Sequence, residues 1–232
     1  MPSPGNSLDE PLRPGKPIVL KFVKAAVLVP TLGLFALLGV RLAGGVLASP
    51  AALPLVALGV LVGYLAADLL SGTVHWFCDT FFAEDTPLIG PTVIRPFRDH
   101  HRHPEAITGY RFLEQDGTNY FILILPLWLA ISADPAGGSI LRLAGLSALW
   151  GLALGSLGTN LFHKWAHTGG APRVVLWLQR RRLILSPESH AVHHRSYTGG
   201  YCVTNGWMNP LLDRLDAFGR VERLVRWRRP RP

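Results

Sequence analysis

The stretch LAADLLSGTVHWFCDTFF, residues 65–82, joins an apolar segment to a histidine and then to an aspartate. Asp68, His75 and Asp79 are spaced seven and four residues apart, which places them on one face of a helix. A helix that enters a membrane near Leu55 has risen roughly 30 Å by His75, about one hydrocarbon thickness. We therefore expect a membrane-spanning helix with His75 at one membrane surface and Asp68 deeper.

The composition of the whole chain also favours a membrane protein. Charged residues make up 16% of the 232 residues, whereas a soluble domain has about 25%, and the mean hydropathy is +0.26. The net charge is +8, but the basic residues flank apolar runs, which fits an anionic membrane face and argues against a nucleic-acid partner. The two cysteines are far apart and form no CxxC pair, so we expect a reducing compartment.

Four apolar segments are predicted to cross the membrane, and we expect an all-α, polytopic membrane protein. The segments are Ile18–Val40, Ala51–Ala67, Tyr120–Ile131 and Ile140–Phe162. The third is shorter than the roughly 20 residues that a span needs, so it requires flanking polar residues or little tilt. The loops AGGVLASP and SADPAGGS carry no basic residue, whereas the middle loop and the C-terminal part are rich in arginine. The positive-inside rule therefore places both termini and a histidine-rich cap in the cytoplasm.

The nine histidines form four groups beside these spans. They are His75, then His100, His101 and His103 in FRDHHRHPE, His163 and His167 in TNLFHKWAHT, and His190, His193 and His194 in ESHAVHHRS. Residues four apart share a helix face, so the HxxxH pair and the HxxHH run each bring imidazoles together. A single histidine at a membrane surface is more often an interfacial residue than a metal ligand, and a single HxxxH pair also arises by chance. Four groups on the same predicted side favour a shared metal centre.

The number of histidines indicates more than one metal ion. No HExxH motif is present, and eight or more imidazoles are too many for one zinc. Imidazole binds iron, zinc, copper and nickel alike, so the donor type leaves the metal open. At a cytoplasmic membrane surface a lipid chain can meet dioxygen and a soluble electron donor. This setting favours two irons that remove hydrogen from an unactivated C–H bond.

Four stretches together resemble the Kua, or plasmanylethanolamine desaturase, family of membrane lipid desaturases. They are DLLSGTVHWFCDT, IRPFRDHHRHPEAIT, TNLFHKWAHT and SPESHAVHHRSYTGGYCVTNGWMNPLLDRL, in order from Asp68 to Leu215. The resemblance implies a ligand set of His75, His100, His101, His163, His167, His190, His193 and His194. His103 lies outside the family pattern, and some members carry a histidine where Ser189 stands. Asp79 matches a family position, either as a ligand or as a group that orients an imidazole.

The resemblance implies oxidative desaturation of an ether phospholipid. The 1-O-alkyl chain of plasmanylethanolamine would become the 1-O-alk-1′-enyl vinyl ether of a plasmalogen, with two iron ions as cofactor and dioxygen as co-substrate. The chain has no dinucleotide fingerprint or haem-attachment motif. Electrons would therefore come ultimately from NAD(P)H through a cytochrome b5-like or ferredoxin-like donor.

Three other functions are weighed against this one. An acyl-lipid desaturase is the alternative within the same class. A non-catalytic metal-binding or redox-sensing protein and a metal transporter belong to other classes. A transporter should carry ionisable groups through several spans, and here only Asp68 is clearly within a span.

Several further residues are candidates for supporting roles. Asp68, Asp99 and Asn160 are candidates to orient ligands, with a solvated surface charge as the alternative for Asp99. Headgroup-binding candidates are Arg95 and Arg98, for which structural pairing competes, and Arg180, Arg181 and Arg182, for which a topology signal competes. In TGGYCVTNGWMNP the glycines indicate turns, and Asn205 and Asn209 are candidates to fix the loop by side-chain hydrogen bonds.

The chain divides into three parts by composition. Residues 1–17 are rich in proline, glycine and polar residues and are expected to be disordered. They do not resemble a cleavable signal peptide, because the polar lead is long and no A-x-A site follows. Residues 18–222 are expected to form the membrane lipid desaturase domain, and residues 223–232 a basic tail. The expected location is a bacterial cytoplasmic membrane or an endoplasmic reticulum, according to the source.

Overall fold

The computed structural model of the chain describes residues 18–111, 118–132 and 139–227, which form helices joined by turns and loops, without a strand. The all-α prediction is therefore confirmed for these residues. Residues 1–17 and 228–232 lie outside them, and with them the predicted N-terminal tail and half of the predicted basic tail. The expected boundary after residue 222 falls inside helix α10 (Ala217–Trp227).

Three helices are long and apolar enough to cross a membrane. They are α1 (Ile18–Ala48), α2 (Leu53–Thr80), which follows the short helix η1 (Pro50–Ala52), and α6 (Ile140–His167). Helix α5 (Thr118–Ser132) is apolar but has only 15 residues. At 1.5 Å per residue it is about 22 Å long, less than a hydrocarbon layer of roughly 30 Å. Three candidate spans are thus present, and a fourth at α5 stays a prediction.

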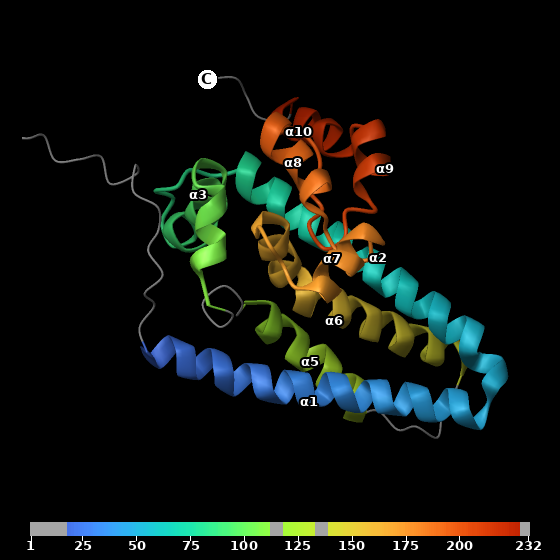
Figure 1. Cartoon of the computed structure of the whole chain (residues 1–232). Coiled ribbons are helices and arrows are strands. Elements are labelled where there is room, and N and C mark those ends of the chain that lie inside the picture. Colours follow the sequence, from blue (N-terminus) through green and yellow to red (C-terminus); the bar gives the residue numbers. More distant parts are fainter. Residues whose placement is uncertain (1–17, 112–117, 133–138, 228–232) are drawn as a thin grey trace, which may run out of the picture.

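Helices α2 and α6 run parallel and make the most extensive helix–helix contact of the described residues (Figure 1). Glycines on both helices permit this contact. Gly63 faces the backbone of Ala148, Gly151 faces the backbone of Val60, and Gly155 faces Ala67. Small residues let two backbones approach closely, as is common where membrane helices pack together.

Helix α5 lies between α1 and α6 and joins them through one apolar cluster (Figure 1). Two hydrogen bonds link it to α1. Thr31 Oγ1 donates to the carbonyl of Tyr120 at 3.3 Å, and Arg41 Nη1 donates to the carbonyl of Ile131 at 2.7 Å. The buried members of the cluster are Leu38, Leu42, Leu123, Leu127 and Ala153. This packing fixes α5 alongside α1 in a parallel direction.

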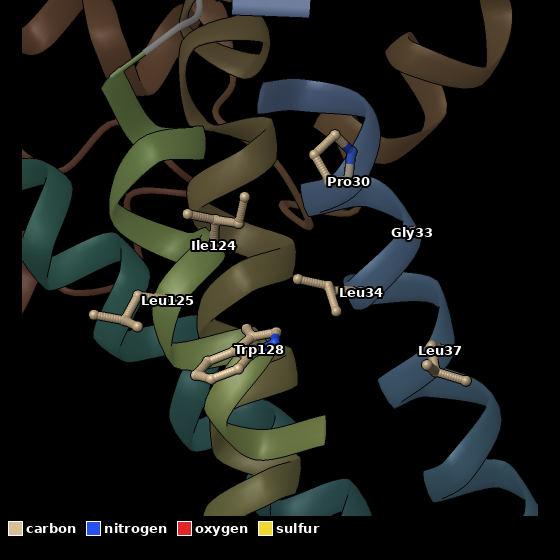
Figure 2. Close-up of a pocket in the computed structure, with 7 residues that line it drawn as sticks. All are labelled: Pro30, Gly33, Leu34, Leu37, Ile124, Leu125 and Trp128. Carbon is tan, nitrogen blue, oxygen red and sulfur yellow. The ribbon is translucent and has the colours of Figure 1, made fainter. Parts of the chain in front are cut away.

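A shallow groove of about 580 Å³ lies between α1 and α5 (Figure 2). None of its lining residues is ionisable, and none is a candidate metal ligand. The lining residues are Pro30, Gly33, Leu34, Leu37, Ile124, Leu125 and Trp128. Its composition and its place on a spanning helix suit contact with hydrocarbon.

The remaining helices form a cap beside the end of the bundle where α2 and α6 finish (Figure 1). Between α2 and α5 lie η2 (Gly90–Ile94), a single turn of π-helix, α3 (Arg95–Arg102) and η3 (Pro104–Gly109). After α6 follow α7 (Arg173–Arg180), α8 (Pro187–Ser196), α9 (Asn209–Arg214) and α10. The cap thus carries α3 and α8, whose sequences contain two of the histidine groups.

Local sequence signals set the bounds of these histidine-bearing helices. The hydroxyl of Ser186 accepts a hydrogen bond from the N–H of Ser189 and caps the start of α8, where Pro187 takes the first position. Helix α3 ends at Arg102, two residues before Pro104, because proline disfavours a helical conformation at the residue before it. Both HxxxH and HxxHH therefore lie on helices, which confirms that reading of their spacing.

Replacing Gly63 with valine should weaken the contact between α2 and α6, because the new side chain would overlap the carbonyl of Ala148. Overpacking of this kind costs about 3 kcal/mol, equivalent to roughly 6–12 °C in melting temperature for a chain of this size. The measurement is thermal unfolding of the detergent-purified protein. Gly145→Val is the matched control on α6, because a side chain there meets open space. Equal losses in the two variants would contradict the packing role of Gly63.

Candidate metal centre

Two groups of side chains converge where α2 and α6 end. One consists of five histidines, namely His100, His163, His167, His190 and His194. The other consists of His75, Asp79, His101 and His193. Within each group the potential ligand atoms all lie within 4.8 Å of one another. Ligands at about 2.0–2.1 Å from an ion lie up to about 4.2 Å apart, so each group could hold a metal ion after small adjustments. We call them the five-histidine group and the carboxylate group.

Helix geometry explains which histidine enters which group. His163 and His167 are four apart on α6 and share the five-histidine group, as do His190 and His194 on α8. His75 and Asp79, four apart on α2, share the carboxylate group. Adjacent residues on a helix point about 100° apart. The neighbours His100 and His101, like His193 and His194, therefore point into different groups.

Ring nitrogens approach one another closely in the five-histidine group. The Nε2 atoms of His163 and His190 are 2.8 Å apart, and those of His190 and His194 are 3.0 Å apart. The Nε2 atoms of His194 and His100 are 3.1 Å apart. Three elements, α3, α6 and α8, thus direct their imidazole nitrogens at one point.

The carboxylate of Asp79 is the centre of the second group. Its Oδ2 atom lies 2.9 Å from His101 Nε2, 3.4 Å from His75 Nε2 and 3.8 Å from His193 Nε2. The Nε2 atoms of His75 and His193 and the Oδ1 atom of Asp79 are buried and have no hydrogen-bond partner among the described residues. Such atoms are costly to bury alone. A cation bound between the imidazoles and Asp79 would satisfy the two Nε2 atoms, so this donor set fits a metal ion.

Backbone carbonyls orient two imidazoles of the carboxylate group. His75 Nδ1 lies 3.1 Å from the carbonyl oxygen of Tyr201, and His193 Nδ1 lies 2.7 Å from that of Gly199. A carbonyl can only accept, so each Nδ1 carries the proton and donates it. The lone pair of each ring is then on Nε2, which faces Asp79, as a metal ligand requires.

Burial lowers the pKa of four cap histidines, namely His100, His190, His193 and His194. Burial, followed by the neighbouring imidazoles, lowers the pKa of His100 to about 2 and that of His194 to about 3. The pKa values of His190 and His193 are lowered as well, again chiefly by burial. Neutral imidazoles have a lone pair free for a metal at neutral pH, whereas protonated ones do not.

The two groups adjoin each other and form one continuous centre. Ring centroids of opposite groups lie 5.3 Å apart for His101 and His194 and 5.9 Å apart for His190 and His193. On the long helices, the rings of His75 and His163 lie 6.1 Å apart. Two ions held here would therefore be close neighbours.

Four other candidate residues lie near the centre but outside both donor groups. His103 ends α3 and belongs to neither donor group, and Ser189 lies beside Gly206. Asp99 is buried, and one of its oxygens lies 3.7 Å from Arg102 Nη2. Asn160 is half-buried on α6, one turn before His163. The roles predicted for Asp99 and Asn160 stay predictions.

The candidate headgroup arginines occupy different surroundings. Arg98 Nη2 donates to the carbonyl of Phe82 at 2.6 Å, at the end of α2, and Arg95 is half-buried. Arg180, the last residue of α7, and Arg181 and Arg182, which follow it, are all exposed. The guanidinium of Arg181 lies 5.9 Å from the ring centroid of Trp177. Arg98 thus stabilises the α2 terminus, and the exposed arginines are accessible to a lipid phosphate.

The loop before α9 confirms one prediction and adds residues that the sequence analysis missed. Asn209 exchanges two hydrogen bonds with the backbone of Cys202, and Asn205 accepts one from the N–H of Trp207. Gly199 and Tyr201 act through carbonyl oxygens, which every residue has, so no side-chain pattern could have identified them.

Comparison with known proteins agrees with the resemblance. A family model described as lipid desaturase domain matches residues 64–231. The chain is 41% identical over 169 residues to plasmanylethanolamine desaturase of Myxococcus xanthus, and the aligned region covers 72% of this chain and 59% of that protein. It is 39% identical over 177 residues to mouse plasmanylethanolamine desaturase 1, covering 74% and 65%. It is 34% identical over 172 residues to chloroplastic fatty acid desaturase 4 of Arabidopsis thaliana, covering 72% and 50%.

The matched region spans less than two thirds of the length of each of these three relatives. No solved structure matches the chain. The family model nevertheless covers most of the chain, including every residue of both donor groups. The chain belongs to the lipid desaturase domain family.

Proposed function

We propose that the protein is a di-iron desaturase that converts the 1-O-alkyl chain of plasmanylethanolamine into a 1-O-alk-1′-enyl vinyl ether with the use of dioxygen. The observation that carries the proposal is the pair of adjacent donor groups at the end of two membrane-spanning helices. Relatives from Myxococcus xanthus and mouse that bear the name plasmanylethanolamine desaturase support the choice of substrate.

Each donor group would hold one iron ion. The five-histidine group offers imidazoles alone, and the carboxylate group adds the single negative charge of Asp79. Imidazole and carboxylate are both suitable iron ligands. When bound, the two irons would activate dioxygen, the oxidant that removes hydrogen from an unactivated C–H bond. The carbonyls of Tyr201 and Gly199 hold two of the ligand rings in the correct tautomer.

The reaction balances with an external supply of electrons. The alkyl chain loses two hydrogen atoms as the C1–C2 single bond becomes a double bond. Dioxygen, these two hydrogens, two further electrons and two protons yield two water molecules. The electrons would come ultimately from NAD(P)H through a cytochrome b5-like or ferredoxin-like protein at the cytoplasmic face.

The depth of the centre suits a target bond beside the lipid headgroup. Leu70, Val74 and Phe77 form an exposed apolar stripe that reaches the last turn of α2, at the height of His75. His75 itself is buried on another face of the same turn. A lipid lying along the stripe would place its first chain carbons, next to the headgroup, level with the donor groups.

Charge supports a cytoplasmic cap in a multi-pass protein. Exposed arginines gather after α6. By contrast, residues 43–50, which comprise the end of α1 and the turn toward α2 on the side away from the cap, carry no charge. We propose that α5 is a short fourth span and that both termini are cytoplasmic. The exposed arginines after α7 would then face anionic lipid or the substrate phosphate.

Removing one ligand should remove one iron. We expect the purified protein to hold two iron ions per chain and His101→Ala to hold about one, because an incomplete site loses affinity. Elemental analysis of the purified protein provides the measurement. His103→Ala is the matched control, since His103 lies two residues away and outside both groups. Equal iron loss from the control would contradict the ligand assignment.

The lipid product provides the test of the activity. Expression in cells that contain alkyl-ether phospholipid should yield acid-labile vinyl ethers, measured by mass spectrometry of the lipids. His193→Ala should lower the product by more than the roughly 10–100-fold typical of groups that only orient a ligand. Full product from this variant would refute the metal assignment. New double bonds in acyl chains, without vinyl ethers, would instead favour an acyl-lipid desaturase.

A further inference from the structure

Asp68 is a fully buried carboxylate on α2, about 10 Å before His75 along the helix. It belongs to neither donor group. Its Oδ1 atom accepts hydrogen bonds from the N–H groups of Thr204 at 3.1 Å and of Asn205 and Gly206 at 2.9 Å. Its Oδ2 atom accepts one from the N–H of Met208 at 3.0 Å. Successive N–H groups around an anion form a nest that offsets the cost of burying the charge.

The segment from Gly199 to Met208, which we call the clamp segment, depends on side chains for its backbone hydrogen bonds. It lies between α8 and α9 and forms neither helix nor strand. The carboxylate of Asp213 accepts from the N–H of Gly200, and Ser71 Oγ accepts from that of Val203. Buried backbone groups must find partners. Asp68 is the largest of these anchors, because it satisfies four N–H groups at once.

The clamp segment also provides both carbonyls that orient ligands. Gly199 accepts from His193, and Tyr201 accepts from His75. The ring of Tyr201 packs against the same two imidazoles, with centroids 5.0 Å and 5.9 Å away. Both histidines belong to the carboxylate group. The clamp segment also touches α6, where Thr204 Oγ1 lies 2.7 Å from Thr159 Oγ1 and Val203 packs against Ala166. The ring nitrogens of His163, His190, His194 and His100 instead approach one another.

We infer that Asp68 is a positioning residue that acts through the clamp segment to set the carboxylate group, because two imidazoles of that group donate to clamp-segment carbonyls. The imidazoles of the five-histidine group are carried by α3, α6 and α8. The inference rests on the proposed two-metal centre and assigns the two ions different dependence on Asp68. Loss of its charge should weaken metal binding at the carboxylate group by roughly 10–100-fold, the range for groups that orient a ligand. The other site should keep its affinity.

The test compares metal loading of full-length variants in detergent, with Co²⁺ as the probe and its visible spectrum as a second readout. Asp68→Asn keeps the shape of the side chain but replaces one acceptor with a donor that faces backbone N–H groups. We expect it to bind one tight ion where the wild type binds two. Its residual spectrum should match that of His101→Ala, which lacks a ligand of the carboxylate group. It should differ from that of His100→Ala, which lacks a ligand of the five-histidine group.

A control separates positioning from loss of stability. Leu127→Ala removes a fully buried side chain of α5 and should lower the melting temperature, since such changes cost about 2–5 kcal/mol. It should keep both ions. If Asp68→Asn fails to fold, Asn209→Ala provides the milder variant, because Asn209 holds Cys202 next to Tyr201. It should weaken the same site selectively.

The outcomes distinguish the inference from the proposed function. Two tight ions in Asp68→Asn, equal weakening of both sites, or a residual spectrum like that of His100→Ala would overturn the inference. A wild-type protein that binds only one ion would refute the two-iron proposal instead. In that case, loss of the single ion from Asp68→Asn but not from Leu127→Ala would support the positioning role. If Asp68→Asn keeps the ion, the positioning role is overturned.

Discussion

Backbone contact between α2 and α6 determines the height at which the metal donors lie. Gly63 faces the backbone of Ala148, and Gly151 faces that of Val60, so sliding either helix would press a side chain against a carbonyl. His75 follows Gly63 by 12 residues, and His163 follows Gly151 by 12 residues. Because the helices are parallel, both histidines emerge at one height, with ring centroids 6.1 Å apart. The cap then adds its ligands around this fixed pair.

Much of this centre is predictable from residue spacing. The spans at α1, α2 and α6, the helical HxxxH pair and the meeting of four distant histidine groups all follow from periodicity and from the positions of histidines beside apolar runs. The division of the ligands between the two groups agrees with helical periodicity but is not among the predictions. Residues four apart enter the same group, and adjacent residues enter different groups. What spacing could not provide is the identity of the helices that face each other.

Two features cannot be predicted from residue spacing, for physical reasons. Asp68 is conspicuous in the sequence because ionisable residues within spans are costly, but its partners are backbone N–H groups 136 to 140 residues away. Those groups, like the carbonyls of Gly199 and Tyr201, are common to nearly all residues and leave no trace in side-chain identity. Helix α5 shows a second limit, because its hydropathy predicts a span while its 15 residues are short of the hydrocarbon thickness.

Helix α2 carries an apolar surface and candidate metal donors on different faces. Leu70, Val74 and Phe77 present an apolar surface, while His75 and Asp79 on another face supply metal donors. Burial of these donors is costly in a low dielectric unless a cation satisfies them. A bound ion would therefore link metal binding to correct packing of the cap, because it would stabilise the arrangement of helices that forms its site. The apolar stripe and the donor groups are thus separated by the width of one helix.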